Sequence, residues 1–227
     1  MSPALPVDAQ SAGKNLVERV RNGWEALTLD VIDFLAGTAD DDEQATLDTL
    51  LREGGSVWRV GETTEGRRGL VRRVADSLQA TADQAMSGGK QHHKHLRKAW
   101  GAAYGRNPSP GEAYKDAVCA VEAVSIPVVQ PSKKPETLGL VIRELIDNPS
   151  KFDTRLRPSP PTSPSAPPLE GVGVVRDMMQ LLWKSQWDRH GVQASVPLTV
   201  SQDEAEDALS LAVTLVRWFE TGAIYRK

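Results

Sequence analysis

Apolar residues recur at three- and four-residue steps along most of this chain, and long alternating runs of apolar and polar residues are absent. This spacing places apolar side chains on one face of an α-helix, whereas a half-buried strand would show strict alternation. Ser109, followed by Pro110 and Glu112, has the pattern that caps and opens a helix. Ser201 and Glu204 repeat the capping-box spacing. The sequence therefore predicts an all-α protein, a helical bundle whose helices pack by their apolar faces.

Eight segments have the helical pattern, separated by glycine, proline or short polar stretches. The predicted helices cover residues 14–35, 43–52, 66–86, 91–104, 110–126, 138–146 and 170–190, and the last begins at 202. Residues 56–65 stay unassigned, as either a short extended piece or a loop packed by Trp58. The break at Ser87-Gly88-Gly89 predicts a boundary between an N-terminal helical region, 1–88, and a C-terminal bundle, 89–227. Within the bundle, the closely spaced prolines of 157–168 predict an extended loop, either a simple connector or a ligand for an aromatic groove.

The charge balance gives the whole molecule no attraction for nucleic acid or for anionic lipid, because the formal net charge of the 227 residues is −3. Any contact with nucleic acid must therefore come from a local basic patch. The single cysteine, Cys119, allows no disulfide within the chain, which favours a reducing environment. The sequence has neither a run of about 18 apolar residues nor the basic and apolar start that is typical of a secretion signal. We therefore expect a cytoplasmic protein without a membrane segment.

Two stretches of the sequence are locally basic. The first places arginines largely outside the apolar stripe of the helix predicted over 66–86, and the second lies on the helix predicted over 91–104. Their members are Arg67, Arg68, Arg72 and Arg73 in the first stretch, and Lys94, Arg97 and Lys98 in the second. Such runs either bind phosphate groups or simply form a solvated face, and both interpretations remain open.

Histidines accompany the second basic stretch. His92 and His95 share a helix face at a spacing that permits metal binding, but zinc normally takes more ligands and none is evident at nearby spacing. The sequence therefore predicts no metal site and no cofactor. Partial positive charge on the imidazoles near neutral pH favours contact with RNA instead.

Three segments occur in an order that resembles a known superfamily of helical bundles. They are the helix at 113–122, with the sequence Ala-Tyr-Lys-Asp-Ala-Val-Cys-Ala-Val-Glu, the segment at 137–142, and Arg189-His190-Gly191 before a helix rich in alanine and valine. Together they resemble the HEPN superfamily, especially the C-terminal domains of bacterial abortive-infection proteins, over roughly residues 95–224. The resemblance implies a compact bundle that often dimerises, and a metal-independent ribonuclease that acts in phage defence or as a toxin.

The same resemblance implies a catalytic role for His190, as general base or acid at the ribose 2′-hydroxyl and the leaving oxygen. Arg189 and Lys184 would stabilise the charge of the phosphorane. The family's motif separates the arginine from the histidine by several residues, whereas Arg189 adjoins His190 here, and Lys184 is the cation at comparable spacing. The alternative is a plain helix end that carries basic residues and stops at Gly191.

Two residues of the 113–122 segment are expected to support this site. Tyr114 and Glu122 lie about two helical turns apart, hence on roughly the same side, so Glu122 can turn inward to pair with a basic group of the last two helices. The alternative is a core tyrosine and a solvated glutamate.

Two functions are consistent with these patterns. The first is an HEPN-like, metal-independent endoribonuclease in a bacterial defence or toxin setting. The second is a non-catalytic helical module that binds a protein partner or nucleic acid, with the nuclease motif incomplete. RNA, a second copy of the chain and a protein are the candidate partners, and no membrane contact is expected.

Overall fold

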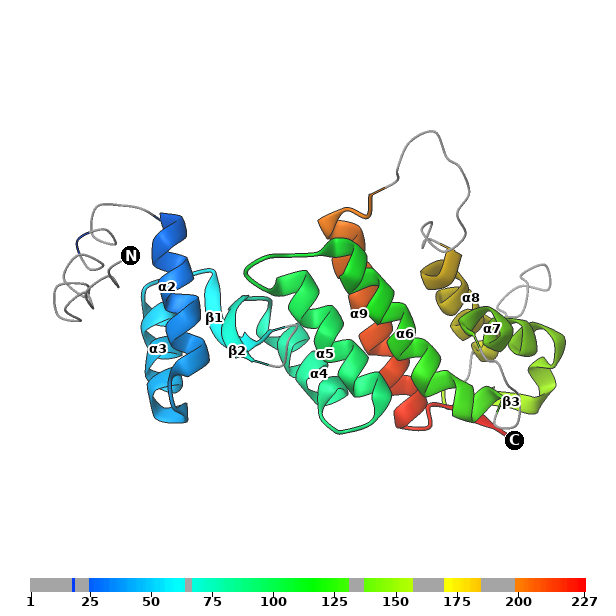
Figure 1. Cartoon of the computed structure of the whole chain (residues 1–227). Helices are drawn as coiled ribbons and strands as arrows, with labels where there is room; N and C mark the ends of the chain where they lie inside the picture. Colours follow the sequence, from blue (N-terminus) through cyan, green and yellow to red (C-terminus); the bar gives the residue numbers. More distant parts are fainter. Residues whose placement is uncertain (1–17, 19–24, 64–66, 131–136, 157–169, 185–198) are drawn as a thin grey trace, which may run out of the picture.

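The computed structural model describes residues 18, 25–63, 67–130, 137–156, 170–184 and 199–227. Across these residues the chain is mainly helical and carries two small antiparallel sheets of two strands each (Figure 1). The predicted helical class is confirmed at this level, and the two sheets are an addition that the sequence analysis did not predict. Among the described helices, none combines the length and the apolar character that crossing a membrane requires.

Helices α2 (Glu25–Thr38) and α3 (Asp41–Glu53) form the N-terminal end of the described structure. Asp40 caps α3, because its carboxylate accepts a hydrogen bond from the Glu43 amide at 2.9 Å and the Glu43 carboxylate accepts one from the Asp40 amide at 3.1 Å. The acidic first turn also lies at the positive end of the helix dipole. The helix predicted from residue 43 is thereby confirmed, while the predicted start of the preceding helix lies outside the described residues.

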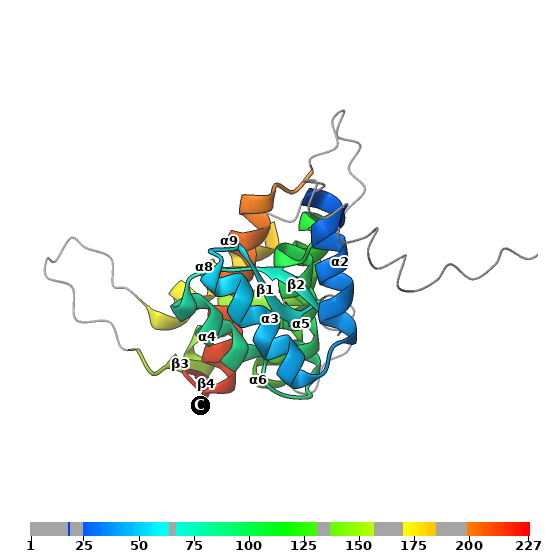
Figure 2. The ribbon, with the colours of Figure 1, turned by 90° about the vertical axis from the view of Figure 1, so that its left-hand side faces the viewer.

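The first sheet is a hairpin of β1 (Trp58–Glu62) and β2 (Arg68–Arg72), in which Val60 lies opposite Leu70. The carboxylate of Asp33 on α2 accepts a hydrogen bond from the Leu70 amide at 2.6 Å, so α2 packs along β2. Figure 2 shows α2, α3 and the hairpin in front of the helical bundle. The hairpin therefore lies between the N-terminal helices and the rest of the molecule.

The helix predicted over 66–86 is wrong in its first part. Residues 68–72 are strand β2, and only α4 (Asp76–Met86) is helical. The apolar pair Leu70-Val71 is buried as expected, but its backbone pairs with β1, which lies in the segment left unassigned. Gly69 favours this outcome, because glycine weakens a helix and a β-carbon there would lie 2.8 Å from the carboxylate oxygen of Asp33.

Three long helices, α5 (Gln91–Tyr104), α6 (Pro110–Val129) and α9 (Gln202–Glu220), form the centre of the bundle (Figure 1). Helix α6 packs against both α5 and α9, and these contacts bury the predicted apolar stripes. Side chains with 1% exposure or less include Leu96, Val118, Val121, Leu209 and Val216. Full burial of one large aliphatic side chain contributes about 1.5–3 kcal/mol, so the shared core is the main source of stability.

The two predicted capping boxes differ in outcome. Ser201 and Glu204 exchange the expected bonds, with the Glu204 amide 3.2 Å from the Ser201 hydroxyl and the Ser201 amide 2.8 Å from the Glu204 carboxylate. Helix α6 begins at Pro110 as predicted, but the Ser109 side chain makes no capping bond, so that box is wrong. Pro127 does not end α6 either, because it lies in the last turn, where its missing amide removes a single bond.

Helices α7 (Leu138–Asp147) and α8 (Gly171–Lys184) pack against each other at the end of the bundle away from the hairpin (Figure 1). A short 3-10 turn (Pro149–Lys151) and β3 (Phe152–Thr154) follow α7. Strand β3 pairs with β4 (Ile224–Arg226), which forms the second sheet near the C-terminus. The shorter helix predicted after residue 137 is confirmed.

The apolar core extends across the boundary predicted at residue 88. Ala82, Ala85 and Met86 of α4 are buried in the same core as the side chains of α5, α6 and α9. Part of the predicted N-terminal region therefore shares the core of the C-terminal bundle. The last residues of the helix predicted over 170–190 lie outside the described residues.

Candidate functional site

The structure leaves the predicted nuclease site untested. Arg189 and His190 lie outside the described residues, and so does the side chain of Lys184, whose backbone ends α8. A catalytic role for these three residues therefore stays a prediction.

Tyr114 and Glu122, predicted to support that site, connect α6 to its neighbours. The buried Tyr114 donates a hydrogen bond from its hydroxyl to the Leu182 carbonyl of α8 at 2.8 Å. The Glu122 carboxylate accepts one from the Leu138 amide at 2.6 Å, where α7 begins. Because the first amides of a helix lack partners within it, this bond stabilises the start of α7. Both contacts hold α7 and α8 against α6.

The hairpin divides the predicted arginine cluster. Arg72 forms an ion pair with Glu206 of α9 and lies over the Tyr104 ring, with 5.5 Å from the guanidinium carbon to the ring centre. Arg73 pairs with Asp48 of α3 at 3.2 Å. Burial, with the nearby Glu206 carboxylate, raises the pKa of Tyr104 to about 12, so the hydroxyl is neutral at physiological pH. These two arginines connect the hairpin to α9 and to α3.

Two of the other predicted basic residues, Arg68 and Arg97, line one cavity of about 510 Å³. The hairpin, α4, the turn after α4 and α5 all contribute to its lining. Arg59 of β1 adds a third guanidinium to this arginine-lined cavity. Its volume lies within the range of small-molecule sites. The remaining predicted basic residues are exposed, namely Arg67, Lys94 and Lys98.

Two of the three guanidiniums are held in place by hydrogen bonds. Arg97 donates to the carbonyls of Met86 and Gly88 at 2.5 and 3.0 Å, and its Nε lies 3.4 Å from the Glu62 carboxylate. Arg68 donates from Nε to the side-chain oxygen of Gln44 at 2.8 Å. These bonds occupy part of each planar group and restrict its rotation. The cavity therefore has guanidiniums whose orientation is defined before any ligand arrives.

Arg59 differs from both of these residues. It is half-buried, and its buried Nε has no hydrogen-bond partner in the part of the chain that the structure describes. Among the described residues it makes no ion pair, although Asp83 and Asp48 lie near enough to act on it electrostatically. Desolvation by burial lowers the pKa of Arg59, and the two carboxylates oppose that shift. A partly desolvated cation without a paired anion is costly, which makes it a candidate ligand-binding group.

Other buried polar atoms at this cavity also lack hydrogen-bond partners within the described ranges. Six buried side-chain atoms among the described residues have no hydrogen-bond partner, and three of them belong to residues that line the cavity. Besides Arg59 Nε, they are Nε1 of Trp100, a side chain that is only 4% exposed, and Oε1 of Gln79. The Gln79 amide nitrogen donates to Asp83 at 2.7 Å. Because buried polar groups are usually paired, this concentration distinguishes the cavity from the rest of the core.

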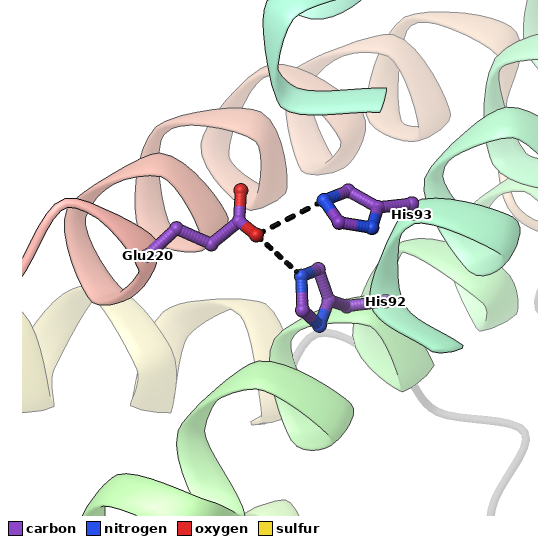
Figure 3. Close-up of side chains that lie close together, drawn as sticks. All are labelled: His92, His93 and Glu220. Atoms are coloured by element: carbon purple, nitrogen blue, oxygen red, sulfur yellow. Dashed lines mark hydrogen bonds and ion pairs between the residues drawn. The ribbon is translucent and has the colours of Figure 1, made fainter. Parts of the chain in front are cut away.

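A second polar group, the histidine–glutamate cluster, joins the start of α5 to the end of α9 (Figure 3). The Nε2 atoms of His92 and His93 lie 2.8 and 2.9 Å from one carboxylate oxygen of Glu220. The Lys90 amide donates to Nδ1 of His93 at 3.1 Å. Because Nδ1 accepts, a neutral His93 carries its proton on Nε2 and donates it to Glu220. Burial, together with the neighbouring His92, lowers the pKa of His93.

The cluster has the donor types that a metal ion needs, and its three ligand atoms lie within 4.8 Å of one another. The bond from Lys90 opposes that use, because Nε2 of His93 must lose its proton to bind a metal while Nδ1 is already an acceptor. The geometry therefore favours hydrogen bonds that join α5 to α9 over metal ligation. His92 and His95, whose spacing permitted a common metal, bond to different partners. His92 bonds with Glu220, and His95 bonds through Nδ1 with Asp116 of α6 at 2.6 Å.

Gly88 connects the cluster to the cavity. It lines the cavity, and its carbonyl accepts the bond from Arg97. Its φ of +139° is a conformation that favours glycine, and a β-carbon there would lie 2.6 Å from the His93 ring. The His93 ring therefore packs directly against the turn that positions Arg97.

Most residues that complete the cavity carried no functional signal in the sequence. Arg59 lies in the segment left unassigned, and Gln79 and Asp83 carried no signal beyond an ordinary helical surface. Trp100 is buried, and the unpartnered state of its Nε1 among the described residues depends on contacts that form only on folding. Only Arg68 and Arg97 carried a sequence signal, through their local density of positive charge.

Comparison with known proteins adds no assignment to this geometry. No family model matches the chain, and neither a curated protein nor a solved structure matches it.

Proposed function

We propose that this chain is a non-catalytic helical protein that binds single-stranded RNA through phosphate contacts in the arginine-lined cavity. The observation that carries the proposal is Arg59, a half-buried guanidinium without an ion pair among the described residues, beside Arg68 and Arg97. A phosphate group would supply the anion that Arg59 lacks. Planar guanidiniums bind phosphate oxygens with paired hydrogen bonds, which gives both strength and orientation.

A polymer is favoured by the surface next to the cavity. Lys94 and Arg97 lie three residues apart on one face of α5, Lys90 is the residue that precedes the helix, and both lysines are exposed. The basic lining of the cavity therefore continues along α5. Because the whole molecule has a formal net charge of −3, binding of RNA needs such a local track. The cavity volume of about 510 Å³ suits one nucleotide of a strand better than a double helix.

Cleavage of RNA is not part of this proposal. No imidazole lines the described cavity, so a general acid or base of the kind predicted at His190 is missing from its lining. The nuclease at Arg189 and His190, a role in phage defence, a homodimer and a cytoplasmic location stay predictions from the sequence.

Fluorescence anisotropy with a labelled RNA of about ten nucleotides tests the proposal. We expect Arg59→Gln to weaken binding about tenfold, because a charge-assisted contact to phosphate is lost. The slope of log affinity against log salt concentration should become shallower by about 0.7, the value for one lost phosphate contact on a single strand.

Arg143→Gln is the matched control. Arg143 is exposed on α7, where it pairs with Asp147 of the same helix at 3.5 Å. No residue of α7 lines the cavity, so the substitution makes the same charge change outside it. Equal losses in the two variants would attribute binding to net charge alone. Undetectable binding by the unaltered chain would remove RNA as the ligand.

A further inference from the structure

The arginine-lined cavity contains carboxylates as well as guanidiniums. Glu62 of β1 and Asp83 of α4 line it together with the three arginines. These two carboxylates oppose part of the attraction that the three arginines exert on a phosphate group. A ligand that has hydroxyl or amino groups next to its phosphate would instead use them as hydrogen-bond acceptors. The mixed lining therefore selects for a ligand of mixed polarity.

The unpartnered atoms have the same mixed character. Arg59 Nε and Trp100 Nε1 are donors, whereas Gln79 Oε1 is an acceptor. The Gln79 amide is already bonded to Asp83, so these two side chains of α4 form one accepting unit. The guanidiniums come from β1, β2 and α5. Donors for a phosphate and acceptors for a hydroxyl group are thus supplied by different elements around one cavity.

The number of guanidiniums favours a terminal phosphate over one inside a strand. A phosphate monoester has a second pKa of about 6 and three free oxygens, so it carries a charge of about −2 at neutral pH. A phosphodiester has one negative charge and two free oxygens. Arg59, Arg68 and Arg97 can therefore make more charge-assisted hydrogen bonds to the monoester.

We infer that the cavity binds a nucleoside monophosphate, with the phosphate at the three arginines and a sugar or base donor at Asp83 and Gln79. This inference rests on the proposed binding of RNA at the same cavity. The chemistry is shared by the phosphorylated end of an RNA strand and by a free nucleotide.

Competition against a labelled RNA tests the inference. The competitors are strands of about ten nucleotides with a phosphate at the 5′ end, at the 3′ end or at neither, and adenosine monophosphate and inorganic phosphate. We expect at least one phosphorylated strand, or adenosine monophosphate, to compete about tenfold better than the unphosphorylated strand and than inorganic phosphate. Arg59→Gln should remove this preference, and Arg143→Gln should retain it.

The outcomes separate the two sources and the two proposals. A phosphorylated strand that competes best assigns the cavity to an RNA end, and adenosine monophosphate that competes equally well assigns it to a free nucleotide. Equal competition by all strands, with no advantage for adenosine monophosphate over the unphosphorylated strand or inorganic phosphate and with binding still dependent on Arg59, overturns this inference and leaves RNA binding intact. A preference that survives Arg59→Gln also overturns it, because the terminal phosphate then lies elsewhere. Failure of the unaltered chain to bind any RNA overturns the proposed function itself.

Discussion

The histidine–glutamate cluster and the arginine-lined cavity meet at Gly88, but they differ in hydrogen bonding. The polar groups of the cluster have partners, whereas several buried polar atoms of the cavity have none among the described residues. In the cluster, both imidazole Nε2 atoms bond with Glu220, and the remaining ring nitrogen of His93 accepts a bond from the Lys90 amide. In the cavity, Arg59 Nε and Trp100 Nε1 have no partner among the described residues. A closed set of bonds stabilises a fold, whereas an open set costs stability until a ligand arrives. The two regions should therefore respond oppositely to loss of a polar group.

The largest effect is expected from Glu220→Ala in the cluster. The substitution leaves two buried imidazole donors without their acceptor, and we expect the free energy of unfolding to fall by about 3 kcal/mol. Urea denaturation measures this loss. Glu112→Ala is the control, because Glu112 is exposed on α6 and only 3.6 Å from the exposed Lys115, a pair worth about 0.5 kcal/mol or less. Similar losses in the two variants would show that the cluster is not a stabilising unit.

Gly88→Ala, at the junction of the two regions, is expected to lower the free energy of unfolding slightly less than Glu220→Ala does. The φ of +139° and the 2.6 Å approach of a β-carbon to the His93 ring should together cost about 2 kcal/mol. RNA affinity should fall too, because the Gly88 carbonyl positions Arg97. Gly89→Ala is the control, since a β-carbon there has no neighbour within 4 Å and its φ is not positive. An unchanged affinity in Gly88→Ala would mean that the turn does not position the cavity.

Acidification should destabilise the cluster by less than either substitution. The pKa of His93 is lower in the folded chain than its unfolded value of about 6.5, so the unfolded chain takes up a proton first as the pH falls. Stability should therefore be constant above about pH 7 and decline through about pH 6.5 toward the folded pKa. The groups that face His93 are Lys90, His92 and Glu220. Melting temperatures across this range measure the decline, and His93→Asn should reduce it; an equal decline in that variant would assign it to other groups.

These two regions also differ in how far the sequence could predict them. Helices α5 and α9 were predictable because their apolar spacing and the Ser201 box are local signals. The hydrogen bond between His92 and Glu220 joins residues 128 positions apart, and no local sequence pattern relates them. The chemistry of the cluster therefore depends on how α5 and α9 pack.

The hairpin was harder to predict for the same reason. Leu70 and Val71 also fit an apolar helix stripe that continues into α4, and only pairing of 68–72 with 58–62 decides in favour of a strand. Because that pairing was missed, Arg59 stayed in the unassigned segment and the cavity could not be anticipated. The charge density at Arg68 and Arg97 was visible in the sequence, but their common position was not. Local sequence patterns thus predict the helices of the bundle, but they do not predict the hairpin or the cavity that it helps to form.

The smallest change in stability is expected from Arg59→Met in the cavity. This result tests the contrast between the cavity and the cluster most directly. Arg59→Met keeps an unbranched side chain and removes a desolvated charge that has no ion pair among the described residues, so the free energy of unfolding should stay within about 0.5 kcal/mol or rise. Arg73→Met on the same hairpin breaks the 3.2 Å pair with Asp48 and should cost about 1 kcal/mol. RNA binding should show the reverse order, with a large loss in Arg59→Met and little in Arg73→Met. Urea denaturation and anisotropy on the two variants measure both quantities. A large loss of stability in Arg59→Met would mean that this guanidinium supports the fold, and the contrast between an open cavity and a closed cluster would no longer hold.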